Sequence, residues 1–315
     1  MAKKYHGVIP PIITPVDENE NVDEKGFRAL LRYCVDRGIH GMFVAGTNGE
    51  TMALTQEQRD RAIKITLDEV GKDVPVMAGV MDSGTRRVIE NIKRLEQMGG
   101  KCAVVTSIFY ARHNSQDETI RHVEAIAKET SIDLAVYNIP PFTGQKLTAA
   151  TILKIAKIDH VTAIKDSGGD FTEFHKIIRE YALNPDMSVL QGVTLQGTGS
   201  FLIGADGYVP SIAPLFPELF VAHYETGVRF YKTGDQQAFK KLMSLDALVA
   251  ETAEVLAMSK NAFAANKFAI SLLGFTGKRI IRPLDTVTAD DEKKIREKVA
   301  AINEKIRALG LVADI

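Results

Sequence analysis

The sequence predicts an α/β protein, a (β/α)8 TIM barrel with a C-terminal all-helical extension. Eight short apolar runs, rich in β-branched residues, alternate with longer amphipathic segments. Most of the runs recur at intervals of roughly 27 to 34 residues, the length of a βαβ unit. They are almost continuously apolar, which is typical of parallel strands buried on both faces. Eight such strands fit a closed barrel better than an open sheet.

The predicted strands and helices follow one another in order along the chain. The strands cover residues 8–16, 41–46, 75–80, 102–107, 134–139, 161–167, 188–193 and 207–211. Residues 23–37 place Phe27 and Leu30 on one face of a helix, and Thr55 with Gln58 has the pattern of a capping box. Helices are also predicted over residues 85–98, 116–129, 171–181 and, more briefly, 195–203.

No strand pattern returns after about residue 215. Residues 217–232, 235–258, 261–273 and 290–309 predict helices. We therefore expect two units: residues 1–220, the barrel that carries the active site, and residues 221–315, a C-terminal helical extension.

Composition excludes several classes of protein. The 315 residues are 45% hydrophobic and 25% charged, which is ordinary for a globular protein. Because 39 basic residues balance 40 acidic ones, nothing favours binding to nucleic acid or to an anionic membrane. The two cysteines, Cys34 and Cys102, form neither a disulfide scaffold nor a metal-ligand pair. No signal peptide and no apolar stretch of roughly 20 residues is visible, so we expect a cytoplasmic protein.

Lys165 is the residue that fits its predicted strand least. It follows the apolar residues 161–164, where burial of an ammonium group is costly. Desolvation lowers the pKa of a lysine and releases the neutral amine, which can attack a ketone. The alternatives are a side chain that reaches solvent at the strand end, or an ion pair with Asp166.

Tyr137 ends the preceding strand, so its side chain would neighbour Lys165 if both point inward. A phenol beside an imine-forming lysine is a plausible proton shuttle, whereas the alternative is a tyrosine that caps the barrel core.

The turn at residues 46–50, GTNGE, lies between a buried strand and a helix. Its backbone N–H groups and the Thr47 hydroxyl could hold a carboxylate. No G-x-G-x-x-G, P-loop or H-E-x-x-H occurs, and the seven histidines do not cluster at strand ends. We therefore expect no cofactor and no metal.

Taken together, these residues resemble the dihydrodipicolinate synthase / N-acetylneuraminate lyase family of class I pyruvate-dependent aldolases. The resemblance spans nearly the whole chain and depends on four ordered motifs: GTNGE at residues 46–50, YNIP at 137–140, IKDS at 164–167 and GADG at 204–207. Such a resemblance implies a metal-independent lyase that usually assembles as a homotetramer, a dimer of dimers.

The resemblance also implies roles for individual residues. Lys165 would form the Schiff base with a 2-keto acid, and Tyr137 would donate and accept protons. Thr47 would link Tyr137 to a tyrosine of a neighbouring subunit, which matches Tyr110. The turn at Thr47 and Asn48 would hold the pyruvate carboxylate. Val209 and Gly192, at the ends of two later strands, would line the same pocket.

The sequence departs from the family at positions that determine the substrate. Members that condense aspartate semialdehyde carry an arginine where this chain has Phe142, and an apolar ring cannot bind a carboxylate as an arginine does. Sialate lyases carry an acidic pair where Thr194 and Leu195 stand. YNIPPFTG most resembles members that act on 2-keto-3-deoxy sugar acids. On the loop after the fourth strand, Arg112 and His113 could supply positive charge instead.

The leading hypothesis is reversible aldol cleavage of a 2-keto acid, such as a 2-keto-3-deoxy sugar acid, to pyruvate and a small aldehyde. Dihydrodipicolinate synthase proper and a Schiff-base dehydratase or deaminase are the enzymatic alternatives. A catalytically silent member that only binds a ligand is the non-enzymatic one.

Overall fold

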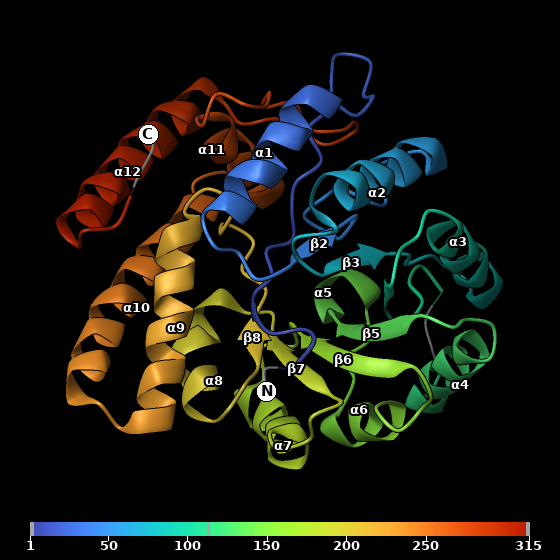
Figure 1. The fold of residues 1–315 in the computed structure, drawn as a ribbon. Coiled ribbons are helices and arrows are strands. Elements are labelled where there is room, and N and C mark those ends of the chain that lie inside the picture. Colours follow the sequence, from blue (N-terminus) through green and yellow to red (C-terminus); the bar gives the residue numbers. More distant parts are fainter. Residues whose placement is uncertain (1–2, 112–113, 313–315) are drawn as a thin grey trace.

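The structure, a computed structural model, describes residues 3–111 and 114–312. Eight parallel strands form one sheet in the order β1-β8-β7-β6-β5-β4-β3-β2, so that neighbours in sequence are neighbours in space (Figure 1). The strands are β1 (Gly7–Val8), β2 (Met42–Val44), β3 (Val76–Gly79), β4 (Cys102–Val105), β5 (Asp133–Asn138), β6 (Val161–Asp166), β7 (Ser188–Gln191) and β8 (Gly207–Tyr208). The predicted fold class is confirmed.

The barrel closes where β1 and the segment that follows it run alongside β2. The N–H of Phe43 donates to the carbonyl of Pro10 at 3.1 Å, and the N–H of Ile12 donates to the carbonyl of Phe43 at 2.9 Å. The N–H of His40 donates to the carbonyl of Val8 at 3.0 Å. These bonds leave the sheet without an open edge, as in other barrels.

The helices of the barrel lie outside the sheet. They are α1 (Glu24–Asp36), α2 (Gln56–Val70), α3 (Thr85–Gln97), α4 (Gln116–Ala127), α5 (Pro140–Thr143), α6 (Ala149–Ile155), α7 (Phe171–Tyr181), the 3-10 helix η1 (Thr194–Gln196) and α8 (Gly197–Leu202). Sequence reasoning missed α5 and α6, because four and seven residues are too few to show a helical period.

The start of α2 differs from the predicted capping box. The Thr55 side chain does accept from the N–H of Gln58. The Gln58 side chain, however, accepts from the N–H of Val22 at 2.8 Å instead of turning back to Thr55. A tertiary hydrogen bond between α2 and the segment before α1 has replaced the local one.

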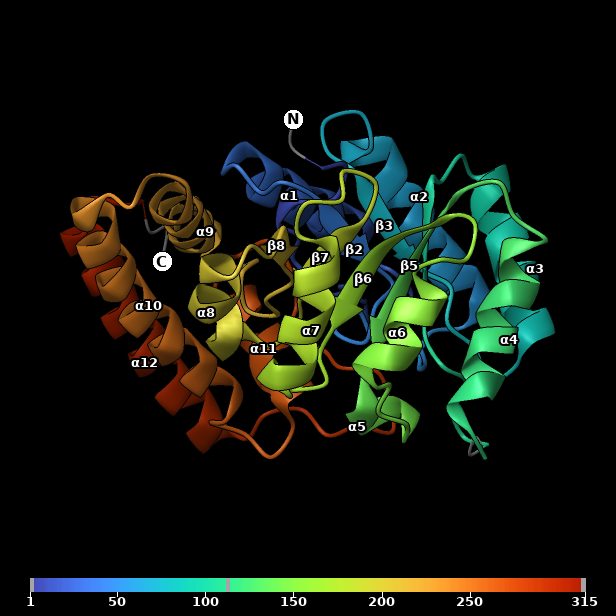
Figure 2. The same cartoon turned by 90° about the horizontal axis from the view of Figure 1, so that it is seen from below.

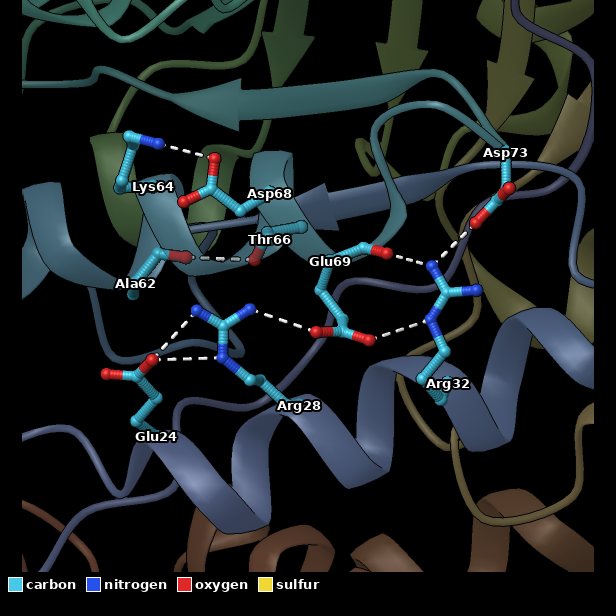
Figure 3. A network of polar contacts seen from close by, with 9 residues as sticks. All are labelled: Glu24, Arg28, Arg32, Ala62, Lys64, Thr66, Asp68, Glu69 and Asp73. Carbon is cyan, nitrogen blue, oxygen red and sulfur yellow. Dashed lines mark hydrogen bonds and ion pairs between the residues drawn. The ribbon is translucent and has the colours of Figure 1, made fainter.

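Helices α1 and α2 are joined on their outer faces by a network of ion pairs (Figure 3). The Glu69 carboxylate accepts from Arg28 and from Arg32, each at 2.9 Å, and Glu24 and Asp73 extend the network at its two ends. Single exposed ion pairs contribute little stability, whereas a shared carboxylate in a network contributes more. The network fixes these helices beside the two strands where the barrel closes.

The C-terminal part is helical, as predicted, with α9 (Pro217–Thr233), α10 (Gln236–Leu256), α11 (Ala262–Ser271) and α12 (Ala289–Ala308). Helix α9 runs unbroken across position 220 and packs on α8 and β1, and α10 packs on α9, α11 and α12. The division of the chain at residue 220 stays a prediction. Figure 2 shows α11 at the same end of the barrel as α5, opposite the N-terminal segment.

The apolar core has two parts. A large cluster fills the space between the strands and the surrounding helices. A smaller cluster, with members from all eight strand segments, fills the barrel itself: Tyr5, Ile9, Phe43, Met77, Met81, Cys102, Val104, Ala135, Tyr137, Ile139, Ala163, Leu190 and Val209. Alternate residues of a strand point to opposite faces, so Ala163 in the barrel places Lys165 on the inner face as well. In the described part of the chain, no helix combines the length and apolarity needed to cross a membrane.

Candidate active site

Lys165 lies near the end of β6 with its side chain inside the barrel, where only 4% of the residue is exposed. Its Nζ atom lies 3.9 Å from the centre of the Tyr137 ring and 4.7 Å from that of Phe43. Loss of solvent lowers the pKa of this amine from 10.5 to about 7. Near neutral pH a substantial fraction of Lys165 is therefore the neutral nucleophile.

Lys165 does not pair with Asp166, the alternative that the sequence left open. The Asp166 carboxylate faces the other way and accepts from Asn138 at 2.9 Å and from the N–H of Gly168 at 2.7 Å. Among the described residues, no carboxylate forms an ion pair with Lys165. The aromatic rings beside Nζ carry no full charge, so they hold the ammonium form less strongly than a carboxylate would.

Tyr137 is the cross-strand neighbour of Lys165 in the β5–β6 pair. The Ser167 hydroxyl lies 3.5 Å from the phenol oxygen as a hydrogen-bond donor. Burial raises the pKa of Tyr137 to about 12, although hydrogen bonds from Ser167 and Thr47 oppose that rise. At neutral pH the phenol therefore keeps its proton and can donate it. Sequence reasoning gave Ser167 no role, although the IKDS motif contains it.

The turn at residues 46–50 presents unused N–H groups, among them those of Thr47 and Asn48. Within the described chain, the backbone N–H of Thr47 and that of Asn48 donate to no protein group, whereas the next two N–H groups close the turn on Gly46 and Thr47. The Asn48 side chain is already engaged, since it donates to the carbonyls of Pro11 at 2.6 Å and Ser211 at 3.4 Å. The backbone of the turn, more than the Asn48 amide, is thus available to an anion.

A cavity of about 230 Å³ joins these groups. It is lined by Pro11, Thr47, Asn48, Tyr137, Ile139, Pro141, Phe142, Lys165, Ser167, Gly192, Val209, Ser211, Leu256, Ala262 and Phe263. Seven of the eight predicted site residues therefore line one cavity, and Tyr110 is the exception. Only glycine fits at position 192, because a Cβ there would lie 1.9 Å from the Ser167 hydroxyl oxygen.

The outer wall of the cavity is aromatic. Phe142, on α5, is 53% exposed, and its ring centre lies 5.7 Å from that of Phe263. Phe263 belongs to α11 and Leu256 to α10, so the helical extension contributes to a cavity that sequence reasoning placed on the barrel alone. Nothing in the local sequence marks these two residues, because their place depends on how the extension folds back over the strand ends.

Tyr110 lies away from this cavity on the loop after β4. Its side chain is fully exposed, and its backbone has φ of +72°, which is rare for a residue with a side chain. Arg112 and His113, which the sequence offered as a source of positive charge, lie outside the described residues. Across residues 3–111 and 114–312, no three His, Cys, Asp or Glu side chains gather as metal ligands would.

Comparisons with known proteins agree on one family. The family model described as "Dihydrodipicolinate synthetase family" matches residues 4–302. An "Uncharacterized DapA-like lyase" of Halobacterium salinarum is 31% identical over 98% of this chain and 95% of its own length. A 4-hydroxy-tetrahydrodipicolinate synthase of Methanospirillum hungatei is 27% identical over 93% of this chain and 98% of its own.

Solved structures are similar over nearly the whole chain. The 4-hydroxy-tetrahydrodipicolinate synthase of Methylacidiphilum fumariolicum is 26% identical with a TM-score of 0.87, over 98% of this chain and 99% of that one. The dihydrodipicolinate synthase of Acinetobacter baumannii, solved in complex with pyruvate, is 25% identical with a TM-score of 0.86, over 95% and 99% of the two chains.

The fold and the site together define a lyase built on a (β/α)8 barrel. The chain belongs to the dihydrodipicolinate synthetase family, as its four sequence motifs predicted.

Proposed function

We propose that this lyase binds pyruvate, or a pyruvate-like keto acid, as a Schiff base on Lys165 and catalyses reversible aldol cleavage of a 2-keto acid to pyruvate and an aldehyde. The observation that carries this proposal is a buried lysine without a carboxylate partner, 3.9 Å from a tyrosine ring. Thr47 and Asn48, whose backbone N–H groups are free, line the same cavity. A nucleophilic amine and an anion-binding turn are what a 2-keto acid requires.

The reaction follows from these groups. The substrate carboxylate accepts hydrogen bonds from the turn, and the neutral amine of Lys165 adds to the C2 ketone. The ketone oxygen leaves as water, and the protonated imine accepts the electron pair of the C3–C4 bond as that bond breaks. The aldehyde departs, and C3 gains a proton before water releases pyruvate from the lysine.

Tyr137 moves the protons in this scheme. Its phenol stays protonated at neutral pH, so it exchanges a proton with the hydroxyl on C4 only if a second group relays one. The hydroxyls of Thr47 and Ser167, which both form hydrogen bonds with the phenol, provide that relay.

The relay would continue into a second copy of the chain. We infer that the partner subunit's Tyr110 reaches Thr47 in a homotetramer, a dimer of dimers. The full exposure of the Tyr110 side chain supports this contact, because the ring is free to pack against a neighbouring subunit.

The aldehyde half is uncharged in this proposal, and a 2-keto-3-deoxy sugar acid is the substrate class that we favour. Phe142 and Phe263 form the outer wall where a carboxylate would lack a partner, which would carry a desolvation cost. The Ser167 and Ser211 residues line the same cavity and offer hydrogen bonds to sugar hydroxyls.

Three other functions are alternatives to aldol cleavage. Relatives named 4-hydroxy-tetrahydrodipicolinate synthase favour that synthase as the second candidate, and Phe142 opposes it. A dehydratase or deaminase would use the same lysine and tyrosine without breaking a C–C bond. A silent ligand-binding member would keep the cavity without turnover. Location in the cytoplasm and independence of any cofactor stay predictions.

Trapping with borohydride tests the proposal. In the presence of pyruvate, reduction should attach one pyruvate-derived mass to Lys165 and inactivate the enzyme. Lys267 is a matched control in the same protein, since it is equally buried but pairs with Glu50 at 2.5 Å. Label on another lysine, or none, would overturn the central claim. Incubation with pyruvate and a panel of aldehydes, followed by product masses, then identifies the aldehyde.

A further inference from the structure

We propose that Asn266 and Lys267, on helix α11 of the C-terminal extension, are positioning residues that set the geometry of the carboxylate-binding turn. The inference depends on the proposed function, because it concerns how that turn holds the pyruvate carboxylate. Neither residue lines the cavity, so each would act through the turn and not by touching the substrate.

The two residues are consecutive on α11, and each is only 1% exposed. The Asn266 side chain donates to the Asn48 side chain at 2.8 Å and to the Ser211 carbonyl at 3.0 Å. The Lys267 ammonium donates to the Glu50 carboxylate at 2.5 Å. Two adjacent side chains of one helix thus hold both ends of the segment 48–50.

Two further polar atoms of the turn are also occupied. The second oxygen of Glu50 accepts from the N–H of Ile281 at 2.7 Å, and the Gly49 carbonyl accepts from the Thr14 hydroxyl at 2.8 Å. Glu50 has φ of +56°, a conformation that a glutamate adopts only when its surroundings impose it. The free N–H groups of Thr47 and Asn48 owe their direction to this anchored backbone.

The ion pair between Lys267 and Glu50 contributes more to the geometry of the turn than to the stability of the fold. Burial of two charges costs free energy that their attraction only partly offsets, and apolar residues of similar size often stabilise as well. An ion pair does, however, fix the distance and direction of its partners. A strained turn whose N–H groups must meet a carboxylate benefits from that rigidity.

The experiment compares variants in α11 with a buried polar network elsewhere. Lys267→Met leaves Glu50 without its cation, and Asn266→Ala removes two neutral hydrogen bonds, to Asn48 and to Ser211, while it leaves the ion pair intact. Thr198→Val is the control, since Thr198 bonds to His223 at 2.7 Å and to Asp246 at 2.5 Å, and none of these three residues lines the cavity. It should lower the melting temperature without a change at the turn.

The readout is the extent of borohydride labelling as a function of pyruvate concentration. This measurement requires no knowledge of the aldehyde. We expect half-saturating pyruvate to rise about tenfold or more in Lys267→Met and about threefold or more in Asn266→Ala, with Lys165 still the labelled residue at saturation. Thr198→Val should keep the wild-type value. If Lys267→Met does not fold, Asn266→Ala and the conservative Lys267→Arg decide the matter, and Lys267→Arg should lie between wild type and Asn266→Ala.

Two failures are distinguishable. If wild-type protein is not labelled by pyruvate at all, the proposed function is wrong. If wild type is labelled and the folded α11 variants keep the wild-type pyruvate dependence, or if Thr198→Val changes it equally, then α11 only stabilises the fold and this inference is wrong.

Discussion

An increase in pH through about 7 should switch on imine formation at Lys165. Burial disfavours the charged amine and lowers its pKa from 10.5 to about 7. Below that pH the side chain is an ammonium ion and cannot attack pyruvate, whereas above it the neutral amine dominates. The pyruvate carboxylate stays ionised throughout, so the lysine alone sets the sign: the rate rises with pH and then levels.

The magnitude follows from the two pKa values. At about pH 7.5, roughly three quarters of an amine with a pKa of about 7 is neutral, against roughly one part in a thousand for a solvated lysine. Burial therefore increases the nucleophilic form by a factor of about 700. On the rising side of the curve, each pH unit should change the rate about tenfold.

The assay mixes enzyme with pyruvate for short times between about pH 5.5 and pH 9.5 and stops each sample in excess borohydride. Intact mass gives the labelled fraction, and Lys165→Arg shows how much label arises elsewhere. The expected rate bends near pH 7 and is flat above about pH 8. A rate that climbs tenfold per unit beyond pH 9 would mean that Lys165 is solvated and that the structural reasoning fails.

Two further substitutions test the phenol and the aromatic wall. Tyr137→Phe should keep pyruvate labelling but lower turnover on the order of 10² to 10⁴-fold, the usual effect of losing a general acid; near-normal turnover, measured with the aldehyde found by product mass, would assign the proton transfer to another group. Phe142→Arg should raise kcat/KM for aspartate semialdehyde about tenfold or more relative to glyceraldehyde, roughly 1.4 kcal/mol in the transition state, because a guanidinium then pairs with the carboxylate. A wild-type preference for the semialdehyde of that size would instead restore dihydrodipicolinate synthesis as the function.

Much of the fold and of the inner site could be predicted from the sequence, because both depend on short-range patterns. Apolar runs at the spacing of βαβ units indicate a barrel, and a lysine within such a run is conspicuous because burial of its charge is costly. Alternation along the strands then places Tyr137 beside Lys165. The short helices α5 and α6 escaped the same reasoning, since few residues give no period to detect.

Only the tertiary structure decided which distant residues complete the site. Asn266 and Lys267 lie 218 and 217 residues from their partners Asn48 and Glu50, so no local pattern connects them. Phe263 reaches the cavity for the same reason, because α11 folds back over the carboxyl ends of the strands. The tertiary structure also distinguishes the two buried lysines. Lys267 contacts a carboxylate, whereas Lys165 contacts aromatic rings. The sequence marks Lys165 as unusual, but the packing of distant segments determines that, among the described residues, its amine faces aromatic rings and no carboxylate.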